Sequence, residues 1–127
     1  MKYILSLAVL VCVVALALAT DAPTTELFKG EISDSQCAMH IHSIKGGHEE
    51  MLKGGMTGKN AGECARFCVE NMGGKYVLAS AKAVYHLDNG KKAEPFAGQR
   101  VVIRGKLDKK TNIIAIASIE KDRAPAK

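Results

Sequence analysis

Five segments of the chain carry the residue pattern of short β-strands. They are residues 26–32, 75–79, 83–87, 100–107 and 113–119. In the first four, apolar and polar side chains alternate, which places one face of each strand in a core and the other toward solvent. The last segment is apolar on both faces, so we expect it to be central or covered. Asp88-Asn89-Gly90 is a strong turn signal after the third strand.

One segment, residues 61–72, has the pattern of an amphipathic helix. Asn60 can cap its first turn, Glu63 stands at the third helical position, and Gly73-Gly74 ends it. The spacing i, i+3, i+4, i+7, i+11 places one set of residues on a single helical face. That set comprises Ala61, Cys64, Ala65, Cys68 and Met72. Both cysteines are therefore expected to point toward the protein interior.

The segment between the first strand and this helix predicts only short helical pieces. Ser33 and Gln36 have the spacing of a capping box, so a helical turn is expected to carry Cys37 and His40. Glycine pairs interrupt the remainder, which should be a loop with one turn at residues 49–53.

These elements predict a mainly β fold with one clear helix, of the α+β class. Five short strands separated by turn signals favour a small five-stranded barrel or sandwich. The closing stretch, residues 96–120, resembles the last hairpin of small secreted OB-like barrels. The Cys/His-rich helical insert at residues 33–74 lies between the first and second strands, whereas the usual OB helix lies between the third and fourth.

The first nineteen residues have the composition of a signal peptide. Lys2 supplies a positive charge, residues 4–18 are almost entirely apolar, and Ala17-Leu18-Ala19 has the small-x-small pattern of a cleavage site. The apolar run is too short for a good transmembrane span, so no span is expected after cleavage. We therefore expect a periplasmic or secreted protein divided as follows: a signal peptide at residues 1–19, a linker at 20–25, one OB-like domain at 26–120 and a loose tail at 121–127.

The net charge and the absence of several known motifs argue against some classes of function. Removing Lys2 from the 18 basic residues leaves 17 against 13 acidic ones, a net charge of +4 that a solvated surface explains. Arg100, Arg104 and Lys106 form a basic stripe, but it lacks the aromatic platform of single-stranded nucleic-acid sites, so no nucleic-acid partner is expected. No HExxH, CxxC, GxSxG or phosphate-loop motif occurs, which favours a non-catalytic protein.

Three cysteines remain after cleavage: Cys37, Cys64 and Cys68. Side chains four residues apart on a helix hold their Cβ atoms about 5–6 Å apart. A disulfide needs about 3.5–4.5 Å, so Cys64 and Cys68 are a poor pair. One alternative is a disulfide from Cys37 to Cys64 or to Cys68, which leaves the remaining cysteine as a thiol. Cysteines of exported proteins usually end in disulfides or metal sites.

The other alternative is a metal site. The three cysteines together with one imidazole make a tetrahedral Cys3His ligand set. His40, three residues after Cys37, is one candidate for the fourth ligand, and His42 and His48 are the others. Thiolate ligands suit zinc or Cu(I). The nearby methionines would favour copper if they point inward: Met39, Met51 and Met56.

Four stretches of the chain carry a family resemblance. They are residues 28–37 (FKGEISDSQC), 64–69 (CARFCV), 74–78 (GKYVL) and 96–107. Through them the chain resembles a family of small secreted bacterial proteins of unknown function. The resemblance implies an envelope-located protein in which the three cysteines and a histidine between them act as a group. In similar sequences the histidine lies shortly before the paired cysteines, where this chain has Asn60, and the closest upstream histidine is His48.

Two main hypotheses about function follow from these patterns, and a third is a small thiol enzyme with Cys37 and His40 as a nucleophile pair. The first is an exported, non-catalytic module whose Cys/His cluster binds zinc or copper, for structure or for metal handling. The second is a disulfide-stapled binding module without metal, whose partner is an unknown small ligand or envelope protein.

Overall fold

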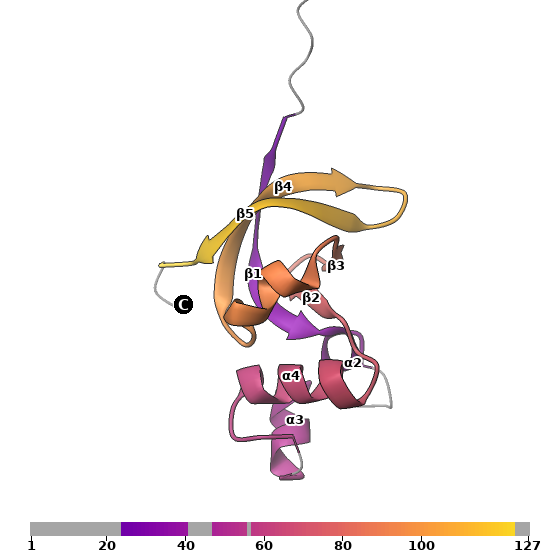
Figure 1. Cartoon of the computed structure of the whole chain (residues 1–127), viewed down its shortest axis with the longest axis vertical. Coiled ribbons are helices and arrows are strands. Elements are labelled where there is room, and N and C mark those ends of the chain that lie inside the picture. The colour runs from indigo at the N-terminus through magenta and orange to yellow at the C-terminus, as the bar shows by residue number, and fades with distance from the viewer. Residues whose placement is uncertain (1–23, 41–46, 56, 124–127) are drawn as a thin grey trace, which may run out of the picture.

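The computed structural model describes residues 24–40, 47–55 and 57–123 (Figure 1). The expected signal peptide, most of the linker and the last four residues of the expected tail lie outside these ranges. His42 and Met56 lie outside them as well. No helix within the described ranges is both long enough and apolar enough to cross a membrane.

All five predicted strands are present. They are β1 (Glu26–Asp34), β2 (Tyr76–Ala79), β3 (Val84–Leu87), β4 (Arg100–Asp108) and β5 (Ile113–Lys121). β1 and β5 each extend two residues beyond the predicted ends, because sheet pairing continues past the point where the apolar alternation fades. Lys121, expected in the loose tail, is the last residue of β5 and pairs with Val101.

The strands form one mixed sheet in the order β1-β2-β3-β5-β4. β1 pairs antiparallel with both β2 and β4, and β4 pairs antiparallel with β5. β2 and β3 are antiparallel neighbours, and the short β3 runs parallel to β5 through His86–Ile113 and Leu87–Ile114. Every strand therefore has a partner on each side, which leaves no strand with a free edge along its paired length.

Short helical segments lie between the strands. They are α2 (Ser35–Ala38), α3 (His48–Lys53), α4 (Ala61–Asn71), α5 (Gly90–Ala93) and the 3₁₀ turn η3 (Glu94–Phe96). The expected turn at Asp88-Asn89-Gly90 is the start of α5, where the Asn89 side chain accepts a hydrogen bond from the Lys92 backbone N–H. The prediction of a single clear helix was therefore incomplete.

The cap of α2 differs from the predicted one. Asp34, not Ser33, is the N-cap residue, and its Oδ1 accepts hydrogen bonds from the backbone N–H groups of Gln36 and Cys37 at 2.9 and 3.0 Å. An extended residue whose carboxylate faces two free N–H groups is a strong cap. Ser33 belongs to the strand, and its hydroxyl turns toward His48 instead.

Among the described residues, two hydrophobic clusters make up the core. The larger one lies within the sheet and includes Ile32, Leu78, Val101, Ile103 and Ile114. The smaller one consists of Cys37, Cys64 and Cys68 and lies among the helices. Figure 1 shows α2, α3 and α4 gathered at one end of the sheet, away from the tip of the β4–β5 hairpin.

A close backbone contact holds the first turn of α4 on the sheet. A Cβ atom on Gly62 would lie 2.6 Å from the carbonyl oxygen of Ala97. Gly98 has φ +73°, and a Cβ there would overlap the backbone of Gly62. The two glycines let the helix and the turn before β4 approach this closely, and α4 in turn carries two of the three cysteines.

Candidate metal centre

Three thiols from two helices converge in the smaller core cluster. Cys37 comes from α2 and is 2% exposed, whereas Cys64 and Cys68 come from α4 and are fully buried. Met51 and Leu52 of α3 and Phe67 of α4 pack against them. The thiols therefore lie in an apolar pocket between α2, α3 and α4, with little access to water.

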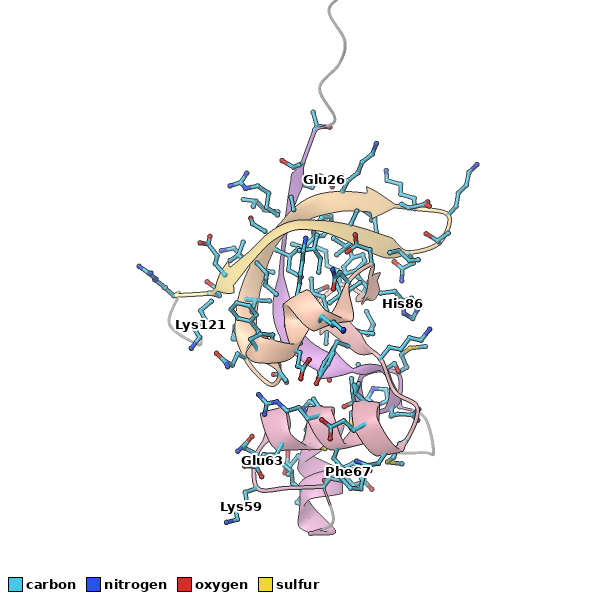
Figure 2. All side chains as sticks on the ribbon, viewed as in Figure 1. Glu26, Lys59, Glu63, Phe67, His86 and Lys121 are labelled. Atoms are coloured by element: carbon cyan, nitrogen blue, oxygen red, sulfur yellow. The ribbon has the colours of Figure 1, made fainter. Side chains whose placement is uncertain are left out.

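The predicted cap and spacing of α4 place its two cysteines. Asn60 accepts a hydrogen bond from the Glu63 N–H at 3.0 Å, and the Glu63 carboxylate accepts one from the Lys59 N–H at 2.8 Å. These bonds fix the start of the helix, so its inner face carries Cys64, Ala65 and Cys68 as predicted. Figure 2 shows Lys59 and Glu63 at the N-terminal end of this helix. Met72, expected on the buried face, is 36% exposed because it follows the last helical turn.

None of the cysteines in the described part of the chain forms a disulfide, and Cys37, Cys64 and Cys68 are all free. The Cys68 thiol points its hydrogen toward the Met72 sulfur at a sulfur–sulfur distance of 3.9 Å. Burial raises the pKa of the Cys37 thiol well above its ordinary range, with the Asp34 charge adding to it. Burial and the Asp34 charge also raise the pKa of Cys68 to about 12. Without a metal, these thiols are neutral at physiological pH.

His48 closes the remaining side of the cluster. It is the first residue of α3, and the preceding Gly47 turns the chain with φ 55°. Its Nε2 lies 3.0 Å from Oδ2 of Asp34 and 3.2 Å from Oγ of Ser33. Its Nδ1 lies 3.4 Å from Oε1 of Glu31. Its side chain is 11% exposed, so the imidazole is held by three β1 residues at the edge of the buried thiols.

The neighbouring carboxylates favour the protonated imidazole. Burial lowers the pKa of His48, but the hydrogen bonds to Asp34 and Glu31 outweigh burial and raise this pKa to about 9. Burial raises the pKa of Asp34, but the hydrogen bonds from His48 and from the Cys37 backbone prevail and lower it. The metal-free site therefore contains a buried carboxylate–imidazolium pair next to the neutral thiols of Cys37 and Cys68.

The ligand atoms form two overlapping groups. Cys37, His48 and Cys64 offer a sulfur, a ring nitrogen and a sulfur that all lie within 4.8 Å of one another. Asp34, Cys37 and Cys68 form a second group by the same measure. Cys37 belongs to both. Ligands of a tetrahedral zinc ion lie about 3.3–3.8 Å apart, given metal–ligand bonds of about 2.0–2.3 Å. Small side-chain movements are thus enough to bring either group onto one ion.

The structure separates the predicted histidines. His48 joins the cysteines, whereas His40 has an exposed side chain and belongs to neither of the two ligand groups. His86 lies on β3, away from the cluster, as Figure 2 shows. Of the methionines that would favour copper if they pointed inward, Met39 is 48% exposed and Met51 packs against the cysteines.

Sequence reasoning missed Asp34 as a member of the site. Its position in Ser33-Asp34-Ser35-Gln36 suggested only a helix start, and the cap was given to Ser33. The signal that was available is the i, i+3 spacing of Asp34 and Cys37 across that start, since a capping carboxylate lies beside the first-turn side chains. One Asp34 oxygen caps α2 and the other contacts His48.

Comparisons with protein-family models, with curated proteins and with solved structures found no match for this chain.

Proposed function

We propose that this protein is a small exported, non-catalytic module that binds one zinc or copper ion through Cys37, Cys64, Cys68 and His48. The observation that carries the proposal is the convergence of three buried, unpaired thiols and one imidazole from three separate helices. A chain this small has a limited core, and a metal cross-link is a common way to stabilise such a domain.

The donor set favours zinc or Cu(I) over harder cations. Three sulfurs and one imidazole nitrogen match the Cys3His pattern of tetrahedral zinc, and thiolates also suit Cu(I). Met51 beside the cluster and the Met72 sulfur near Cys68 supply thioethers that would favour copper. Asp34 is then the outer partner that orients His48, as carboxylates commonly orient metal-bound imidazoles.

Export and an OB-like scaffold belong to the same proposal. The apolar N-terminal segment with its cleavage pattern and the family resemblance support export. The strand order β1-β2-β3-β5-β4 and the helical turns α5 and η3 between β3 and β4 support an OB-like fold. Outside the cytoplasm, free thiols tend to oxidise, so three thiols kept unpaired are consistent with protection by a metal.

Elemental analysis of the protein, purified from the periplasm of an expression host without added metal, tests this function. We expect about one zinc or copper per chain and three thiols that alkylate only after unfolding in a chelator. Cys64→Ser should lose the metal, and His86→Gln, which changes a histidine away from the cluster, should keep it. Folded wild-type protein without metal would contradict the proposal.

The disulfide alternative has a distinct signature in the same experiment. Cys37 lies in a ligand group with Cys64 and in another with Cys68, so either pair needs a movement to reach the bond length of about 2.05 Å. A metal-free protein with one thiol and one disulfide would support a stapled binding module instead. Mass spectrometry of the alkylated protein distinguishes one reactive cysteine from three.

A further inference from the structure

A cleft of about 460 Å³ opens beside the metal centre. Cys37 and His48 line it, whereas Cys64 and Cys68 do not. The centre thus has two sides: a side that reaches the cleft and a side enclosed by α4 and the packed residues around it. Further polar side chains line the cleft wall: Glu31, Ser33, His40, Glu49 and Arg100.

We propose that the bound ion is exchangeable cargo that enters and leaves through this cleft by direct transfer to another ligand. The inference rests on the proposed metal-binding function. It adds that the protein binds the ion in order to pass it on, and not only to stabilise its own fold. A structural zinc site is closed on all sides by its four ligands and their surroundings. In this protein two candidate ligands, Cys37 and His48, line the open cleft.

His48 is the ligand suited to leave first. Its side chain is 11% exposed, against 2% or less for the whole of each cysteine. It begins a six-residue helix that has no buried residue and no side-chain cap. A short helix with so little buried surface can shift at low cost, because most of the stability of a helix comes from tertiary packing.

Asp34 is the hydrogen-bond partner of the imidazole once it has left the ion. When the metal–nitrogen bond breaks, the imidazole stays hydrogen-bonded to the Asp34 carboxylate, whose Oδ2 is 3.0 Å from Nε2 in this structure. At the same time a donor atom of the incoming ligand forms a bond to the ion. No electrons are transferred, and the thiolates keep the ion until the incoming ligand replaces them.

The cleft wall also offers groups that hold a cation on its way. Glu49 is exposed at the first turn of α3, and Glu31 contacts His48. His40 lines the same cleft from the end of the α2 segment. Carboxylates and an imidazole leading to deeper thiolates form a graded set of ligands, from weaker at the entrance to stronger inside.

Chelator competition on the full-length, zinc-loaded protein tests this route. The protein is mixed with an excess of a coloured pyridylazo zinc chelator, and the transfer rate is followed by absorbance. We expect the rate to rise in proportion to the chelator concentration. Ala38→Phe fills the cleft from its wall and should slow transfer by about tenfold, with zinc affinity unchanged. The matched control Ala81→Phe adds the same ring in a different cleft and should leave the rate unchanged.

Two results would overturn the inference while leaving metal binding intact. One is a transfer rate that does not depend on chelator concentration. Such a rate would mean that the whole site opens and releases zinc before the chelator binds it. The other is an equal rate in A38F and the wild type. If A38F does not fold, the wild type is tested with the same chelator fixed to a large polymer. Slow transfer to the tethered chelator supports the cleft route, and unhindered transfer overturns it. Wild-type protein that binds neither zinc nor copper overturns the proposed function itself.

Discussion

The Oδ2 atom of Asp34 lies 3.0 Å from the Nε2 atom of His48, which joins the end of β1 to the first residue of α3. The Asp34 side chain is fully buried, and that of His48 nearly so. The other Asp34 oxygen caps α2. One carboxylate therefore positions both the helix that carries Cys37 and the histidine that completes the site.

Substituting Asp34→Asn tests this double role. The amide oxygen can still cap α2, but the charge that pairs with His48 is lost. We expect the free energy of unfolding of the metal-free protein to fall by about 3 kcal/mol at pH 7, since removing one partner leaves a buried charge uncompensated. Denaturant unfolding followed by circular dichroism measures it. The control Glu49→Gln breaks only the exposed pair with Lys53 and should cost at most about 0.5 kcal/mol.

The pH dependence of stability also tests the pair formed by Asp34 and His48. Because the pKa of His48 is about 9 in the folded state and about 6.5 when unfolded, its contribution is fully present below pH 6.5 and is lost as the pH rises through 9. We expect the metal-free protein to lose up to about 3 kcal/mol across that window. His48→Gln should flatten the curve. An equally steep curve in H48Q would assign the loss to another group.

A matched pair of histidine substitutions identifies the fourth ligand. His48→Ala should weaken zinc binding by about 100-fold or more, whereas His40→Ala should change affinity by less than about threefold. The reason is that His48 lies with Cys37 and Cys64, and His40 belongs to neither group. Competition with a chelator of known affinity measures both. A larger loss in H40A than in H48A would exclude His48 as the fourth ligand.

Proton release on zinc binding gives an independent count of ligands. At pH 7 the Cys37 and Cys68 thiols of the metal-free site are neutral and His48 is protonated. Binding through three thiolates and His48 should therefore release about four protons per zinc. Calorimetry in buffers of different ionisation enthalpy measures this number. Release of three protons would indicate that His48 keeps its proton and that another group completes the coordination.

The contact between α4 and the turn before β4 predicts an effect on stability at a position that is not itself a metal ligand. Gly62→Ala places a methyl group 2.6 Å from the Ala97 carbonyl oxygen, which should cost about 1–3 kcal/mol of stability. Gly54→Ala is the control, because its nearest contact is 3.4 Å and its backbone is already helical. Thermal unfolding of the two variants checks the difference. Equal stability would mean that α4 tolerates a shift along the sheet.

Local patterns in the sequence determined where the strands and the longest helix of this protein form. The apolar alternation identified four strands, a run that is apolar on both faces identified the fifth, and the Asn60 cap with its periodic apolar face identified α4. These features depend on neighbouring residues, because backbone geometry links residue spacing directly to side-chain direction. The same spacing was sufficient to predict that Cys64 and Cys68 share a buried face of α4.

Tertiary structure decided which histidine joins the thiols and what Asp34 does. His40 is nearer to Cys37 in the sequence, yet the turn after α2 leaves it exposed, while α3 brings His48 back to β1. The parallel pairing of β3 with β5 is likewise invisible in local patterns. Such contacts join residues far apart in the chain, and they depend on how whole elements pack rather than on any residue's immediate neighbours.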